Sequence, residues 1–142
     1  MKLSTGKIAF PVEFDNGDKE FIYFNPNDPD LFIRLSETQA RISERIKNLS
    51  DFEINTDGTP KKQEDYELFK TYRQIMCEEI NRAFDNNVSD VLFKHVNPLA
   101  ITDGQYYVSY VLQALMPEIL AEIEKARAEL ETKMMNYIKE YV

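Results

Sequence analysis

The first part of the chain contains two short runs rich in apolar residues, and the first of them alternates. Residues 7–14 place an apolar side chain at every second position, and residues 19–24 are rich in aromatic side chains. The sequence DNGD separates the two runs, and Asn-Gly in such a place strongly signals a tight turn because both residues tolerate positive φ. We therefore predict a β-hairpin over residues 7–24. Pro11 donates no backbone hydrogen bond, so we expect its strand at a sheet edge.

After the hairpin, apolar residues recur every three or four positions, which is typical of amphipathic helices. The first such segment predicts a helix over residues 29–50, in which Asp28 suits the N-cap and Pro29 the first helical position. A second helix is predicted over residues 63–84, and the polar sequence that starts at Asp85 is expected to stop it.

A short helix is predicted for residues 88–95. Asn87 or Ser89 would cap its N-terminus, because short polar side chains accept hydrogen bonds from the first free N–H groups. Asn97-Pro98 would end it, since the residue before a proline is pushed out of helical geometry.

Two longer helices are predicted for residues 103–116 and 118–141. Thr102 or Asp103 would cap the first of them. Pro117 lies between the two, and a proline inside a helix removes a donor and clashes with the preceding turn. We therefore expect a kink or break just before it.

Length and composition are those of a single domain. The chain has 142 residues, of which 43% are hydrophobic and 30% charged, and only four are glycine. This is enough apolar material for one core, and a glycine-poor chain favours helix. The predicted class is therefore α+β and mainly helical. One domain over residues 1–142 starts with an antiparallel β-hairpin, followed by three to five helices with a long C-terminal helix.

The charge balance narrows the range of partners. The chain carries 25 acidic against 17 basic residues, a formal net charge of -8. Proteins that bind nucleic acids need a basic face that displaces counterions from phosphate, so we expect no nucleic-acid partner. No run approaches ~18 uninterrupted apolar residues, so we expect no membrane partner. The start MKLSTGKIAF lacks the apolar run of a signal peptide, and a cytoplasmic location is the default expectation.

Two residues are candidates for a catalytic role. His95 is the only histidine, but a general base needs an orienting partner and a nucleophile within reach, and the surrounding sequence contains no nucleophile motif. We interpret it as structural. Cys77 is the only cysteine and lies among apolar helical positions, so we expect a core thiol rather than a nucleophile.

Metal and cofactor chemistry find little support. One histidine and one cysteine do not make a zinc site, and the four glycines lack the spacing of a phosphate-binding loop. Acidic residues do recur on the helices. They could hold a metal ion only if they were paired one helical turn apart, as in a metal-dependent helical hydrolase. We interpret them as solvated surface and expect no cofactor. These acids are Glu78, Glu79, Glu118, Glu122, Glu124 and Glu131.

Apolar surface is the remaining feature. Apolar residues crowd into 91–116, and the segment 118–141 has its own apolar stripe on a helix ~36 Å long. A body of this size cannot cover such a helix easily, so we expect apolar surface that binds a partner or a second copy. The candidate partner-binding residues are Phe93, Leu99, Tyr106, Tyr110, Met116, Ile119, Ile123, Leu130, Met134 and Tyr137.

The order of these features resembles a known family. An N-terminal strand pair, the segment FDNNVSDVLFKHVNPL and a last helical region containing VLQALMPEI are together similar to the small tail assembly chaperones of long-tailed phages and prophages of Gram-positive bacteria. The resemblance covers roughly residues 7–120, and none of its motifs is catalytic. Many members have glycines where this chain has DNN at 85–87.

The resemblance implies a binding protein that is not an enzyme. Such chaperones bind the long, helical, apolar tape measure protein in the host cell before the tail tube polymerises around it. Self-association through the C-terminal stripe would place several copies along one client. A structural or oligomeric virion or adaptor protein, acting through the C-terminal helix, is the alternative. An acid-rich helical metal-dependent hydrolase is less favoured.

Overall fold

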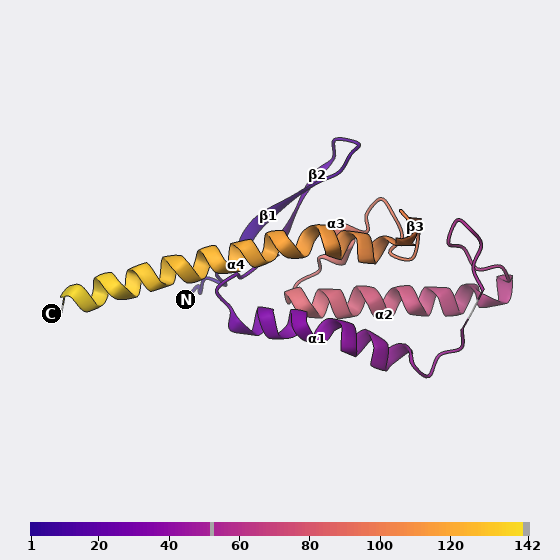
Figure 1. Ribbon diagram of the computed structural model, residues 1–142, viewed down its shortest axis with the longest axis horizontal. Coiled ribbons are helices and arrows are strands. Elements are labelled where there is room, and N and C mark those ends of the chain that lie inside the picture. The colour runs from indigo at the N-terminus through magenta and orange to yellow at the C-terminus, as the bar shows by residue number, and fades with distance from the viewer. Residues whose placement is uncertain (52, 141–142) are drawn as a thin grey trace.

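The computed structural model describes residues 1–51 and 53–140, and its class is the predicted α+β. A β-hairpin is followed by helices, the last of which is by far the longest (Figure 1). The elements are β1 (Ile8–Glu13), β2 (Lys19–Phe24), α1 (Pro29–Ile46), the 3-10 turn η1 (Gln63–Asp65), α2 (Tyr66–Phe84), α3 (Ser89–Leu92), β3 (Ile101–Thr102), β4 (Gln105–Tyr106) and α4 (Tyr107–Glu140).

The N-terminal hairpin confirms the alternating pattern. Strands β1 and β2 pair antiparallel, and a backbone hydrogen bond of 2.8 Å from Phe14 N–H to the Asp18 carbonyl closes the turn. Ile22 and Phe24 are buried, because alternate residues of a strand face the same side. Pro11 lies opposite Phe21 in this two-stranded sheet, where each strand is an edge.

Helix α1 begins as the sequence predicts. The Asp28 side chain accepts a hydrogen bond of 2.9 Å from the backbone N–H of Asp30, and Pro29 occupies the first turn. The helix ends at Ile46, however, which is earlier than the predicted end at residue 50.

Helix α2 also follows its prediction, while the next helix is shorter. The turn η1 leads into α2, and Asp85 ends α2 in the left-handed region with φ of 51°. Helix α3 is then a single turn, Ser89–Leu92, rather than the predicted 88–95.

The cap of α3 corrects the sequence prediction. The side-chain oxygen of Asn81, on α2, accepts hydrogen bonds of 2.9 Å and 2.8 Å from the backbone N–H groups of Val88 and Ser89. Neither Asn87 nor Ser89 provides the N-cap. The local sequence suggested a neighbouring residue, but the acceptor comes from the preceding helix.

The prediction of two helices at 103–116 and 118–141 was wrong. Residues 107–140 form one helix, α4, with Pro117 inside it. The predicted end at residue 141 lies outside the described residues. Pro117 is exposed, whereas Leu115 and Ile119 on either side of it are buried in the core. Packing of both flanking turns therefore holds the helix together across the missing hydrogen bond.

The segment before α4 is a second small hairpin. Thr102 pairs with Gln105, and the turn between them places Asp103 and Gly104 at positive φ, 52° and 75°. Such a turn is typical of tight hairpins. The sequence had suggested that Thr102 or Asp103 caps a helix. In the structure both residues belong to the hairpin instead.

The core lies where the first hairpin, α2 and the first half of α4 meet. The rings of Phe24 and Phe84 approach edge to face with centroids 5.9 Å apart, which joins β2 to α2. Helix α4 adds a face of side chains at helical spacing. The fully enclosed cluster consists of Ile22, Phe24, Leu31, Ile80, Ala83, Phe84, Val88, Leu92, Val108, Leu115, Ile119 and Ile123.

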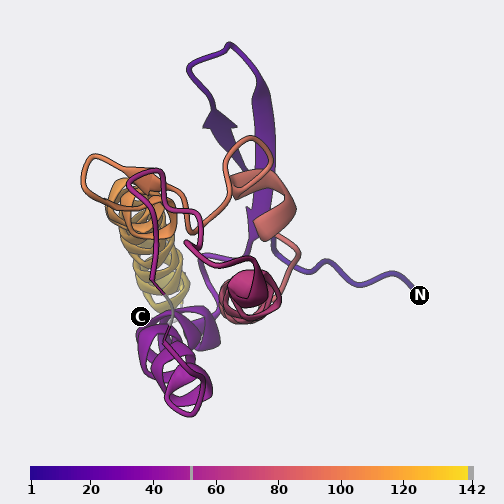
Figure 2. The ribbon, with the colours of Figure 1, turned by 90° about the vertical axis from the view of Figure 1, so that its right-hand side faces the viewer.

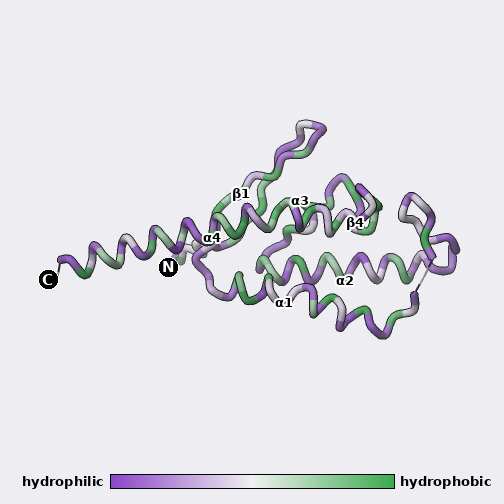
Figure 3. Tube along the Cα trace, in the orientation of Figure 1, coloured by the Kyte–Doolittle hydropathy of each residue, from purple (hydrophilic) through white to green (hydrophobic). Residues whose placement is uncertain are grey.

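The last part of α4 leaves the body of the protein. Ala126 is the last buried residue of the helix, and every residue from 127 to 140 is exposed. We call residues 127–140 the α4 tail, which is ~21 Å long. It extends beyond the other elements in Figure 1, and Figure 3 shows hydrophobic positions recurring along it.

A candidate helix-binding groove between α1 and α4

Helices α1 and α4 lie on the same side of α2. Seen end-on in Figure 2, the three helices occupy the corners of a triangle. Among the described residues, α1 packs directly on α2, while the backbone of α4 keeps its distance from both over most of its length. The side chains of α1, α2 and α4 leave an open groove of about 430 Å³ between α1 and α4.

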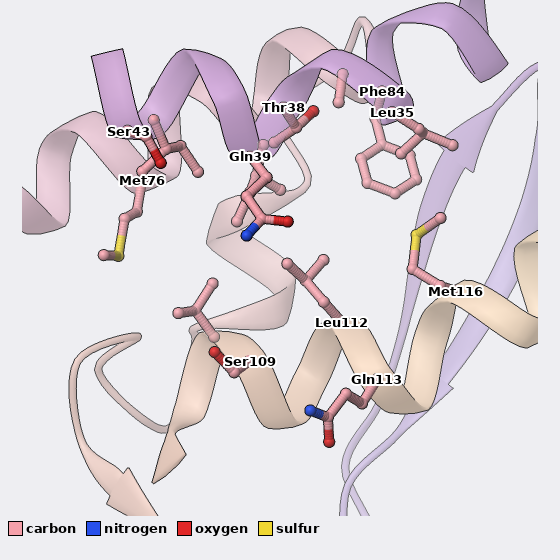
Figure 4. Close-up of a pocket in the computed structure, with 14 residues that line it drawn as sticks. Leu35, Thr38, Gln39, Ser43, Met76, Phe84, Ser109, Leu112, Gln113 and Met116 are labelled. Carbon is pink, nitrogen blue, oxygen red and sulfur yellow. The ribbon is translucent and has the colours of Figure 1, made fainter. Parts of the chain in front are cut away.

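We call this feature the α1–α4 groove. Helix α1 provides one wall, α4 the opposite wall, and α2 the floor (Figure 4). Each wall is one helix face, because its residues recur at intervals of three and four. The lining residues are Leu35, Thr38, Gln39, Ile42, Ser43, Met76, Ile80, Ala83, Phe84, Val108, Ser109, Leu112, Gln113 and Met116.

The groove has an apolar interior and a polar edge. Leu112 extends from α4 toward α1, and Phe84 lies at the floor. Gln39 and Gln113 are exposed, one on each wall. The hydroxyl of Thr38 donates to the Arg34 carbonyl at 2.8 Å and is therefore satisfied inside α1.

Charge is missing from this surface. Among the described residues that line the groove, none is Asp, Glu, Lys, Arg or His, although 30% of the chain is charged. An uncharged apolar groove between two helices suits an amphipathic helix, which inserts side chains at i, i+3, i+4 and i+7. It offers no counter-charge to a phosphate or carboxylate ligand.

The sequence-predicted binding residues divide between four places. Leu99, Ile119 and Ile123 are buried in the body, so they present no surface to a partner. Their apolar character reflects core packing. Met116 lines the groove.

The remaining six predicted residues lie at the surface or near it. Leu130, Met134 and Tyr137 belong to the exposed α4 tail. Phe93 and Tyr110 lie near the start of α4, and Tyr106 belongs to β4, immediately before it. There, Tyr107 contacts the rings of Phe93 and Tyr110 at centroid distances of 6.3 Å and 5.8 Å. The structure therefore does not join the ten residues into one surface.

Sequence reasoning missed the α1 wall of the groove. The sequence predicted an amphipathic helix over residues 29–50, which includes Leu35 and Ile42, but an apolar stripe on one helix does not reveal which second helix stands opposite. Only the placement of α4 turns this face into a wall.

His95 holds the first hairpin in place. Its Nε2 lies 2.8 Å from Oδ2 of Asp18, and its ring meets that of Phe14 edge-on with centroids 4.7 Å apart. Lys94 Nζ contacts the same Asp18 oxygen at 2.9 Å and also contacts Glu20. The Lys94 and His95 hydrogen bonds hold the pKa of the Asp18 carboxyl below its ordinary value. These contacts fasten the hairpin turn to the segment after α3.

The adjacent acids Glu78 and Glu79 are paired with arginines of α1. Arg41 Nε lies 2.6 Å from Glu79, and Arg45 lies 2.7 Å from Glu78 and 3.2 Å from Glu79. Hydrogen bonds from Gln74 and then Arg45 lower the pKa of Glu78, and Arg41 is the main cause that lowers the pKa of Glu79. Both carboxylates are thus engaged in joining α1 to α2.

Cys77 is less buried than its sequence context suggested. It lies on α2 with part of its side chain accessible. Burial raises the pKa of its thiol, while a hydrogen bond with Ser89 and the nearby Arg73 act in the opposite direction. Within residues 1–51 and 53–140, no group of three His, Cys, Asp or Glu side chains could hold a metal ion.

Comparisons with known proteins give no match: no protein-family model, no curated protein and no solved structure matches the sequence. In the part of the chain that the structure describes, no helix has both the length and the apolar character needed to cross a bilayer.

Proposed function

We propose that this protein binds an amphipathic helix of a partner in the α1–α4 groove and keeps that partner soluble, as a phage tail assembly chaperone does for the tape measure protein. The observation that carries the proposal is the uncharged apolar groove between two helices. The sequence resemblance supports the choice of client. The proposed role is binding without catalysis or cofactor, in the cytoplasm of a bacterial host.

The size of the groove fits this role. At about 430 Å³ it has room for about three or four large apolar side chains, the number by which one helix face anchors in a groove. The polar side chains Gln39 and Gln113 at its edges can hydrogen-bond to the polar flanks of such a helix.

The acidic surface supports the same role. A net charge of -8 keeps the chain and its complexes apart by repulsion. An apolar client that would aggregate alone is thereby carried by a well-solvated protein. A virion or adaptor protein that acts through the α4 tail is the second candidate, favoured by the exposure of the tail.

The test is co-expression with the tape measure protein. The proposal predicts that the reading frame immediately downstream encodes a long coiled-coil protein. The full chain is produced together with that protein, and the soluble fraction and co-purification of the downstream protein are measured. We expect a soluble complex. If the downstream protein stays insoluble and no complex is isolated, the proposal is wrong. Finding the chain at stoichiometric amounts in purified particles would instead favour the virion protein.

Variants connect the complex to the groove. Leu112→Glu places a charge in the α4 wall, and Gln39→Trp fills the groove from an exposed position that the core does not need. Both are expected to weaken client binding about tenfold or more. Ile33→Glu is the control, since Ile33 is an exposed apolar residue of α1 that does not line the groove. Equal binding by all three variants would place the client elsewhere.

A further inference from the structure

The α4 tail carries a broad apolar surface of its own. Its large apolar side chains are between 52% and 61% exposed, and they cover a wide arc of the helix. An isolated helix of this length is marginal in water, so a tail with such a surface is stabilised by whatever covers it. The residues are Leu130, Met134, Met135, Tyr137 and Ile138.

The tail and the groove wall belong to the same side of one helix. Leu112 and Met116 of the wall and Leu130 and Met134 of the tail are members of a single stripe at intervals of three or four. The middle of this stripe, around Ile119, is covered by the protein's own core. Helix α4 therefore presents a receptive surface near one end and an apolar ridge near the other, facing in similar directions.

We infer that two copies of this chain associate with their α4 helices antiparallel, so that the tail of each copy lies in the α1–α4 groove of the other. Leu112 at the groove and Met134 at the tail are ~33 Å apart along the helix. A two-fold axis at the level of Ile123 along α4, on the side of the exposed Leu120, brings both tails to both grooves at once. In this register Met116 faces Leu130 of the second copy, and Leu112 faces its Met134.

The chemistry of the two surfaces favours a second copy as the occupant. The described groove lining carries no charge that would select or repel a charged partner, and the tail brings apolar side chains at the i, i+4 and i+8 positions, such as Leu130, Met134 and Ile138. Leu120 is also exposed, close to the two-fold axis, and extends the apolar surface between groove and tail.

The area is sufficient for a specific dimer. Two reciprocal contacts, each with a tail of 127–140 in a groove, bury on the order of 2,000 Å², which lies within the range of stable homodimer interfaces. A single tail in a single groove would fall near the lower limit. Reciprocity is therefore what makes the association stable, and it closes the assembly at two copies rather than extending it into a filament.

The test is the mass of the purified full chain in solution, measured by analytical ultracentrifugation over a range of concentrations. We expect a dimer. Met134→Glu in the tail and Leu112→Glu in the groove should each raise the apparent dimer dissociation constant about tenfold or more, and Ile33→Glu should leave it unchanged. A wild-type chain that stays monomeric at every concentration overturns the inference.

Cross-linking distinguishes tail-in-groove pairing from pairing of two tails. In a Cys77→Ser background, Met116→Cys combined with Leu130→Cys is expected to form a covalent dimer, because disulfides need Cα atoms within about 7 Å. Leu130→Cys alone is expected to remain uncoupled. A covalent dimer from Leu130→Cys alone shows that the tails pair with each other, and the inference is then wrong.

These measurements are independent of the client. Failure to dimerise overturns the inference and leaves the proposed function standing. A dimer that binds no tape measure protein overturns the proposed function and leaves the inference standing. If both proposals hold, the tail of a second copy occupies the groove until a client helix replaces it.

Discussion

Arg41 and Glu79 join the groove's α1 wall to its α2 floor, with Arg41 Nε 2.6 Å from Oε2 of Glu79. Glu79 is only 3% exposed, and Arg45 contacts its second oxygen at 3.2 Å. A carboxylate this buried stays charged because two guanidinium groups compensate the loss of water. The ion pair therefore fixes the helix that forms one side of the proposed binding site.

Replacing Glu79 is expected to destabilise the fold. Glu79→Ala removes the shared acceptor and leaves a small void, so we expect the free energy of unfolding to fall by about 1–3 kcal/mol. Urea denaturation measures the change. Glu67→Ala is the control on the same helix, because the Glu67 side chain is 86% exposed, and a change within about 0.5 kcal/mol is expected. Equal effects of the two substitutions would mean that the ion pair contributes nothing.

Glu79 also predicts the direction of acid sensitivity. Its pKa is lowered in the folded state, mainly by Arg41, so its stabilising effect is present above the ordinary carboxyl pKa and is lost as the pH falls through the lowered folded value. Urea midpoints measured from about pH 6 down to about pH 3 should therefore decline less steeply in Glu79→Gln than in the wild type. Parallel curves would contradict this explanation.

Asp18 offers a test at the first hairpin. Its pKa is lowered, first by the hydrogen bond with Lys94 and then by that with His95. Lys94→Met should therefore raise the pKa of Asp18 toward its ordinary value, as measured by the NMR shift of its carboxyl carbon during titration. Lys19→Met is the control, since Lys19 is adjacent in sequence but lies over the ring of Phe21. A larger shift in the control would show that Lys94 is not the main cause.

Short-range signals account for the parts of the fold that the sequence predicted. The Asn-Gly turn, the Asp28 cap and the left-handed stop at Asp85 each depend on a few neighbouring residues. The cap of α3 was missed because its acceptor, Asn81, lies on another helix. Where a cap or turn is local, the sequence is a sufficient guide.

The candidate groove could not be predicted in the same way. Leu35 and Leu112 each belong to an apolar helix face, and from the sequence such a face is expected to be buried in the core. These faces are partly open because the backbones of α1 and α4 stay apart. The sequence predicted that the C-terminal helix carries more apolar residues than the body can cover. It did not predict which of them are buried and which are exposed. Ile123 packs inside the body while Leu130, seven residues later, is exposed, because the body ends between them.

Pro117 makes α4 weaker than its length suggests. It is exposed within a continuous helix and cannot donate to the carbonyl of residue 113. Pro117→Ala should therefore raise the free energy of unfolding by about 1–3 kcal/mol, measured by urea denaturation. Pro29→Ala is the control, since a proline in the first helical turn loses no hydrogen bond. A fall in stability on Pro117→Ala would mean that the ring itself contributes packing.

The stripe along α4 predicts opposite results at its two ends. Ile119 is fully buried, so Ile119→Ala should lower the free energy of unfolding by about 2–5 kcal/mol through lost apolar burial and the cavity that remains. Ile138 is 57% exposed in the α4 tail, and Ile138→Ala should change that free energy by no more than about 0.5 kcal/mol. Both are measured by urea denaturation at concentrations low enough to keep the chain monomeric.

The same pair of variants separates folding from association. Ile138→Ala removes apolar area from the tail, so it should weaken the dimer at high concentration while leaving the monomer's stability intact. Ile119→Ala should lower the monomer's stability without weakening the contacts between copies, because Ile119 lies in the core of its own chain. If Ile138→Ala destabilised the dilute monomer as strongly as Ile119→Ala, the tail would have to pack on its own body, and the surface offered to a second copy would not exist.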